Sequence, residues 1–209
     1  MAPRVFLHPI EISGLPRLGP GEPVIYAAVE KGEGAREFLA ARLVDALAGV
    51  APEWSEASSW GGLEVVAGPL GQPFLQLGGR PGPSISFSTA GDLLWAAVAA
   101  LGQVGVDAAR EEDFSAPYPY SRAFGPKEWD WARRHCQGQT ASAAALLWAA
   151  KEAAVKARGV GFHTLDPLDL EVVLLAPAGE GRHLMVRAPE PVTAWARPLA
   201  DGWLALAVV

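Results

Sequence analysis

One long stretch of this chain lacks the residues that interrupt helices. Although the 209 residues include 23 glycines and 18 prolines, neither type occurs from Thr140 to Arg158. Alanine and leucine dominate this stretch, so it predicts a single long helix, with Thr140 as its cap and Gly159 as its stop.

Two of the four lysines in the chain flank one glutamate within this predicted helix. Trp148, Glu152 and Lys156 stand four residues apart and share one stripe, while Lys151 points about 100° away from Glu152. On spacing alone, a glutamate four residues before a lysine is most often a weak stabilising pair on a solvated face. A functional role for the stripe needs support from elsewhere in the sequence.

Size and composition indicate a globular protein that can bury a full core, because half of its residues are hydrophobic. The formal net charge of -6 argues against a nucleic-acid partner. A single cysteine excludes an internal disulfide, and no apolar run reaches the length of a membrane span. The first residues lack the apolar core of a secretory signal, so we expect a cytoplasmic protein, acting as a monomer.

Other candidate sites are less convincing. The four histidines are scattered without the spacing of metal ligands, so we expect no transition-metal site. Cys136 adjoins His135, but neighbours in sequence seldom bring their side chains together as a nucleophile and its base.

The order of apolar runs predicts an α+β fold with two similar halves. The first half predicts a strand near Val24, a helix over 35–48 and several further strands. The second predicts a strand over 104–107, a short helix, the long helix, and strands from residue 170 onward. Each half therefore combines one principal helix with a sheet.

The two halves also align with each other. A shift of 109 positions brings residues 38–42 onto 147–151 and Asp92 onto Asp201, although the tryptophans that follow these two aspartates fall one residue out of register. Two alignments at one offset suggest an ancient duplication about a pseudo-twofold axis.

The helix sequence WAAKEAAVKARGVGF closely resembles the signature helix of the Sfp-type 4'-phosphopantetheinyl transferases, W-x-x-K-E-x-x-x-K followed by glycine. The second element of that family is an upstream strand ending in G-[IV]-D, and Gly105-Val106-Asp107 matches it. Two motifs in the right order and at the right separation make the resemblance specific.

Weaker features of the same family are also present. They are Gly71-Gln72-Pro73 before an apolar strand, the strand sequence over 84–89, and Phe124-x-x-x-Glu128 ahead of the long helix. The resemblance covers residues 36–209 and is weakest over the first 35.

The resemblance implies a fold of two pseudo-duplicated α/β halves, 1–102 and 103–209, with the active site at their interface. It implies transfer of 4'-phosphopantetheine from coenzyme A to a serine of an apo acyl or peptidyl carrier protein, with magnesium or manganese. By the same resemblance, Asp107 and Glu152 are the metal ligands and catalytic residues. Lys156 is the catalytic phosphate contact, and Lys151 supports the same field or the packing of the helix. Glu152 or a metal-bound water accepts the serine proton.

Coenzyme A is expected to contact Ser88, Thr89, Gln72 and Pro73, together with the two lysines. Three positions depart from the family pattern. Ala109 replaces a frequent third acid, Thr89 replaces a histidine, and Gln72 replaces a basic residue. Arg36 and Arg42 are candidate substitutes for the lost positive charge. The same departures keep open a rival function, a catalytically weakened relative that only binds carrier proteins or coenzyme A.

A carrier protein is typically acidic, as this chain is, so docking is expected to use a local patch. We predict that residues 114–120, with Arg122, Arg133 and Arg134, form this patch, because aromatic and arginine side chains are favoured in interface cores. Trp148 is expected to pack in the core.

Overall fold

The computed structural model describes residues 24–57, 60–68, 71–162 and 164–209. Within them the chain forms three α-helices and three β-sheets, which confirms the predicted α+β fold class. The elements are β1 (Val24–Glu30), α1 (Ala35–Ala48), β2 (Leu63–Ala67), β3 (Pro73–Leu77), β4 (Arg80–Pro81), β5 (Ser84–Ala90), β6 (Leu93–Ala99), β7 (Val104–Arg110), α2 (Pro126–His135), α3 (Thr140–Ala157), β8 (Glu171–Ala178), β9 (Gly181–Arg187), β10 (Val192–Pro198) and β11 (Gly202–Val208).

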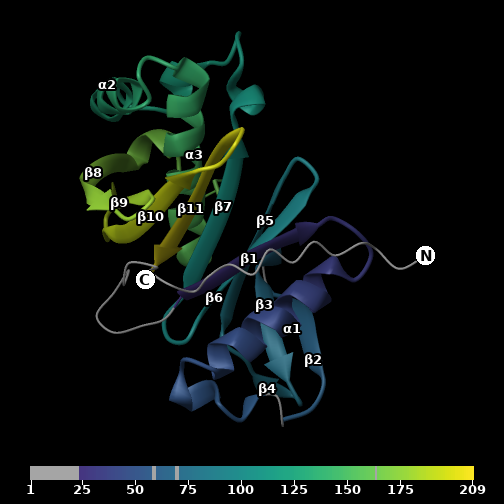
Figure 1. The fold of residues 1–209 in the computed structure, drawn as a ribbon. Coiled ribbons are helices and arrows are strands. Elements are labelled where there is room, and N and C mark those ends of the chain that lie inside the picture. Colours follow the sequence, from purple (N-terminus) through teal and green to yellow (C-terminus); the bar gives the residue numbers. More distant parts are fainter. Residues whose placement is uncertain (1–23, 58–59, 69–70, 163) are drawn as a thin grey trace.

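The first half is built on the sheet β1-β6-β5, with α1 across one of its faces (Figure 1). Leu39, Leu43 and Leu47 recur at helical spacing on α1 and are buried in one core with Val29 and Val98 of the sheet. The small sheet β2-β3-β4 completes the same core.

The second half is built on the sheet β7-β11-β10-β9-β8, and α3 covers it. Alanines on α3 allow the helix to approach β7 closely, and a Cβ atom at Gly105 would overlap the carbonyl oxygen of Ala153. The glycine of the Gly-Val-Asp motif is therefore required by packing. Although α3 has 18 residues, no helix in the described part of the chain is both long and apolar enough to cross a membrane.

The strand order repeats between the halves. β1-β6-β5 and β7-β11-β10 have the same antiparallel neighbours, and a further core lies between these two sheets. Trp95 belongs to that middle core, whereas Trp203 belongs to the core beneath α3. Adjacent strand residues face opposite sides of a sheet, so the one-residue offset between the tryptophans places them in different cores. The repetition supports our proposal of two duplicated halves, of which residues 1–23 lie outside the described part.

The halves meet where β5 lies beside β7. Three serines at alternate positions of β5 accept hydrogen bonds from alternate backbone amides of β7, and we call this set of bonds the serine seam. Its bonds run from Val104 N to Ser84 Oγ (3.0 Å), from Val106 N to Ser86 Oγ (3.1 Å) and from Ala108 N to Ser88 Oγ (3.2 Å).

Candidate functional site

A cavity of about 530 Å³ opens between the serine seam and α3. Its polar side chains come from both halves of the chain, with Ser88 and Thr89 on β5, Asp107 on β7, and Glu152 and Lys156 on α3. The lining residues are Arg36, Phe87, Ser88, Thr89, Asp107, Ala108, Ala109, Asp113, Phe114, Tyr118, Trp148, Glu152 and Lys156.

Asp107 is held from two sides. It is only 6% exposed, and its Oδ1 atom accepts a hydrogen bond of 2.7 Å from Lys156 Nζ and one of 2.8 Å from Ser88 Oγ. Both of these bonds end on the same oxygen, so Oδ2 is the atom better able to meet a ligand. Ser88 was expected to bind coenzyme A, but its hydroxyl is already engaged by Asp107 and by the amide of Ala108.

Glu152 lies on the same side of α3 as Lys156, as the helical spacing predicts. The two side chains are 3.9 Å apart, so Lys156 interacts with the carboxylates of both Asp107 and Glu152. Burial raises the pKa of the Glu152 carboxyl, the negative charge of Asp107 raises it further, and Lys156 opposes both effects. A carboxylate with a raised pKa is a stronger base when it is ionised.

The donor atoms at this site fit a hard divalent cation better than a transition metal. No group of three or more histidine, cysteine, aspartate or glutamate side chains in the described ranges could hold a metal ion. Magnesium, however, commonly binds through one or two carboxylates and completes its shell with phosphate oxygens and water. Asp107 and Glu152, beside space for a diphosphate, fit that requirement.

A second cavity of about 310 Å³ continues the first. Arg36, Phe87, Glu152 and Lys156 line both cavities, so together they form one cleft. The remaining wall of the second cavity is neutral near Gln72, as its sequence indicated. The residues lining only the second cavity are Gly71, Gln72, Pro73, Ile85, Ser86, Gly159, Val160 and Gly161.

The structure separates the two arginines that were candidates for phosphate binding. Arg36 stands in the first turn of α1 and lines both cavities, with its guanidinium carbon 5.4 Å from the centre of the Phe87 ring. Arg42 is exposed on the same helix and lines neither. Thr89 lines the first cavity together with Arg36.

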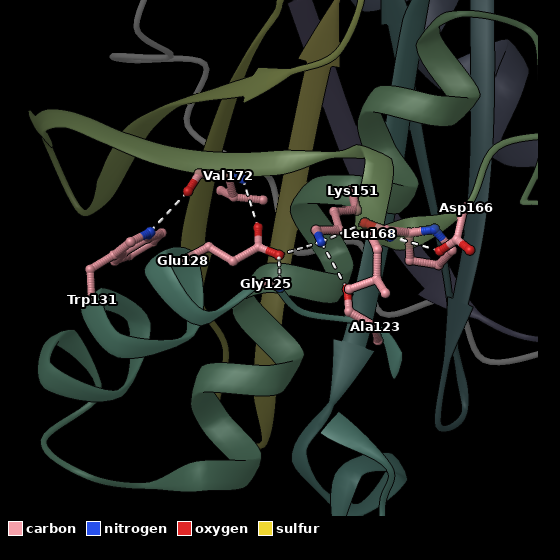
Figure 2. A network of polar contacts seen from close by, with 9 residues as sticks. Ala123, Gly125, Glu128, Trp131, Lys151, Asp166, Leu168 and Val172 are labelled. Atoms are coloured by element: carbon pink, nitrogen blue, oxygen red, sulfur yellow. Dashed lines mark hydrogen bonds and ion pairs between the residues drawn. The ribbon is translucent and has the colours of Figure 1, made fainter. Parts of the chain in front are cut away.

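Lys151 does not face the cleft. It is fully buried on the other side of α3, where it forms an ion pair with Glu128 (Figure 2). Of the two roles expected for Lys151, support of the phosphate field is wrong, because its ammonium is enclosed by protein acceptors. Support of the helix's packing agrees with its position.

Trp148 packs against the core beneath α3, as expected, and it also forms part of the cavity wall. It packs between Phe114 and Phe162, at ring-centre distances of 6.2 and 5.1 Å. Phe114 in turn contacts Tyr118 edge to face at 5.0 Å. The cleft therefore has a charged floor and an aromatic wall.

The expected docking segment, residues 114–120, is only partly exposed. Phe114 is only 3% exposed and forms part of the aromatic wall, so it offers little surface to a partner, while Tyr118 is half-buried at the cavity. Arg122, Arg133 and Arg134 are exposed, as a docking role requires.

Asp113 is a cavity residue that the motifs did not indicate. It stands in η4 (Glu111–Phe114), the short 3-10 helix that follows β7, and only this acid of the three consecutive ones lines the cleft. Glu112 instead forms an ion pair of 2.6 Å with Arg110. A run of acids shows no periodicity, so the sequence carried no signal for which one faces inward.

His135 and Cys136 do not form a nucleophilic pair. The His135 ring packs between Trp131 and Trp203, and burial lowers its pKa. Burial raises the pKa of the Cys136 thiol, which keeps it protonated and unreactive.

Comparison with known proteins agrees with this geometry. Residues 103–206 match the family model of the 4'-phosphopantetheinyl transferase superfamily. The matched segment contains β7, α3 and the side chains of Asp107, Glu152 and Lys156. No curated protein matches the chain. From the match and the fold together, residues 103–206 are a domain of the 4'-phosphopantetheinyl transferase superfamily.

Proposed function

We propose that this protein transfers 4'-phosphopantetheine from coenzyme A to a serine of an apo acyl or peptidyl carrier protein. The proposal includes the Sfp-type subfamily, a divalent metal, and a cytoplasmic monomer. The observation that carries it is that Asp107, Glu152 and Lys156, all three from the matched domain, converge in one cleft. Two carboxylates around one ammonium are suited to a metal-bound phosphate ester.

Asp107 and Glu152 would hold the magnesium or manganese ion. When bound, the ion neutralises the diphosphate of coenzyme A and makes it a better electrophile. Ser88 and Lys156 hold Asp107 in place, because both bond Oδ1. Lys156 also lies close enough to the cavity to bond a phosphate oxygen as a point charge.

The proposed transfer forms one bond and breaks one. The serine oxygen of the carrier protein bonds to the phosphorus nearer the pantetheine, and the bond from that phosphorus to the bridging oxygen breaks. The leaving group is 3',5'-ADP, which takes the bridging oxygen with it. Glu152 accepts the serine proton, and its burial supports this role because burial strengthens a carboxylate as a base.

Arg36 supplies the positive charge that Thr89 and Gln72 lack. Its place at both cavities puts a guanidinium between the neutral wall of the second cavity and the charged floor of the first. A guanidinium binds phosphate oxygens through paired hydrogen bonds. We therefore assign Arg36 to the phosphates of the nucleotide.

The rival function is a relative that binds coenzyme A or a carrier protein without transferring anything. It is favoured by three uncharged residues that line the cleft where related proteins carry charge, Thr89, Ala109 and Gln72. The complete set of Asp107, Glu152 and Lys156 opposes it, since a binding module needs no base beside its phosphate site.

Mass spectrometry distinguishes the two functions. The protein is incubated with coenzyme A, magnesium and several apo carrier proteins, and each carrier is weighed for added phosphopantetheine. We expect product with the native protein and none with Glu152→Gln. Binding of coenzyme A, measured by calorimetry, without product on any carrier would contradict transfer and favour the binding module.

A further inference from the structure

The ion pair between Lys151 and Glu128 lies at a junction of several elements (Figure 2). Lys151 Nζ donates three hydrogen bonds, to Glu128 Oε1 at 2.5 Å, to the carbonyl of Ala123 at 2.8 Å and to the carbonyl of Pro167 at 2.7 Å. An ammonium has three donors, so these bonds use all of them. The lysine is 0% exposed, and no donor is left for a substrate.

Glu128 is equally well bonded. Its Oε1 also accepts a bond of 2.8 Å from the amide of Gly125, the N-cap residue just before α2, and its Oε2 accepts one of 2.7 Å from the amide of Val172 on β8. The pair thus joins α2, α3, the loop before α2 and the start of β8. It also reaches η6 (Pro167–Asp169), a short 3-10 helix, through the carbonyl of Pro167.

Stability alone is a weak reason to keep such a pair. Both ions are removed from water, and burial lowers the pKa of Lys151 even though Glu128 opposes the shift. Apolar residues of similar volume often replace a buried ion pair without loss of stability. A hydrogen-bonded ion pair depends on the angle between donor and acceptor, whereas an apolar contact does not. Each of these bonds therefore forms only at one rotation of α3 about its axis.

That rotation matters because Lys151 immediately precedes Glu152 on α3. The two side chains point about 100° apart, one into the junction and the other into the cleft. Holding Lys151 in place therefore also sets the position of the Glu152 side chain beside Asp107. It sets the position of Lys156, one turn later, in the same way. The bond to Pro167 also restrains the segment after α3, whose first residues line the second cavity.

We propose that Lys151 and Glu128 are positioning residues, which set the rotation of α3 and so the distance between the carboxylates of Glu152 and Asp107. This inference rests on the proposed transferase function for its kinetic consequence. Neither residue touches the substrate, and both act through Glu152.

Substitution of the pair tests the proposal. Lys151→Met keeps an unbranched side chain one atom shorter and removes its charge, and Glu128→Gln removes the carboxylate. The matched control is Ser142→Ala, which deletes a buried hydrogen bond from Trp203 at the opposite end of α3. We expect kcat of transfer to fall about 10- to 100-fold in Lys151→Met, with a smaller change in KM for the carrier protein. The control should keep kcat at a comparable loss of Tm.

Hydrogen exchange and metal binding provide readouts that do not need activity. In Lys151→Met we expect faster exchange in the second half of α3 and in residues 164–172, and weaker Mn²⁺ binding by electron paramagnetic resonance in the presence of coenzyme A. Equal effects in Ser142→Ala at matched Tm would show that the pair only stabilises the fold, and would overturn the inference. If the native protein forms no product, the proposed function fails, while exchange and Mn²⁺ binding still decide the positioning role.

Discussion

Ser88 donates a hydrogen bond of 2.8 Å to Asp107, and the two residues belong to different halves of the chain. The same hydroxyl accepts a bond from the amide of Ala108. The carboxylate assigned to the metal is therefore fixed by the contact that joins the halves, and its position depends on β5 as much as on β7.

Ser88→Ala should lower both stability and transfer. The substitution leaves the buried amide of Ala108 without its acceptor, at a cost of about 1–3 kcal/mol, and frees Asp107 to rotate. Urea denaturation and steady-state kinetics measure the two effects. Ser84→Ala removes the bond at the far end of the seam and should leave kcat nearly unchanged. An equal loss of kcat in both variants would contradict a specific role for Ser88.

Glu152→Gln should abolish transfer and stabilise the fold above mildly acidic pH. Because the folded pKa of Glu152 is raised, the folded state binds its proton more tightly, and stability contributed by this group is lost as pH rises above the ordinary value of 4.5. The amide avoids that loss, so Tm should rise at neutral pH. Below pH 4.5 the two proteins should melt alike. A lower Tm at neutral pH would count against the assigned burial effect.

Lys156→Met should shift the acid limb of the pH–rate profile to higher pH. Lys156 lowers the pKa of Glu152, so its removal raises that pKa further and a higher pH is needed to ionise the base. The acid limb of the pH–rate profile should shift less in Lys156→Arg, because arginine keeps the positive charge. Identical limbs in Lys156→Met and the native protein would exclude Glu152 as the titrating base.

Arg36→Gln should raise the KM for coenzyme A by about tenfold, the equivalent of one charge-assisted hydrogen bond. Arg42→Gln is the matched control, because Arg42 is exposed on the same helix and lines neither cavity. Salt should weaken coenzyme binding less in Arg36→Gln than in the native protein. Equal KM values in the two variants would remove Arg36 from the phosphate site.

Reversal of Arg133 and Arg134 to glutamate should raise the KM for the carrier protein and leave the KM for coenzyme A unchanged. Both arginines are exposed in the last turn of α2, where reversed charge would repel an acidic partner. Kinetics with the carrier as the varied substrate measure the effect. An unchanged carrier KM would rule out this docking surface.

The sequence alone was sufficient for α3 and for the stripe on its cleft side, although the N-cap is Gln139 and Thr140 is already the first helical residue. The absence of glycine and proline located the helix, and the helical repeat of about 3.6 residues placed Glu152 beside Lys156. The Gly-Val-Asp motif added Asp107, although the contact between Asp107 and Lys156 joins residues 49 positions apart. The family resemblance was needed for that contact, since spacing within one element cannot show which two elements meet.

The orientation of the Lys151 side chain could not be predicted, because it depends on a partner in another element. Its place on α3 was predictable, but Glu128 lies 23 residues earlier and reaches it only because α2 packs across α3. The alternating serines of β5 likewise indicated a strand without revealing that their hydroxyls face β7. The core packing of Trp148 was predictable from its type, but its place in the cavity wall was not, because that wall also needs Phe114 and Tyr118 from another segment.

The serine seam fixes the register between β5 and β7 as well as holding the two halves together. Every residue of a strand carries a peptide group. Two strands paired only by backbone hydrogen bonds could therefore shift by two residues and still form nearly the same bonds. A slide of two residues along the seam would leave one β7 amide without a hydroxyl and carry Ser88 past Asp107. The serine side chains of β5 thus determine how the two halves align, and this alignment determines the shape of the cleft.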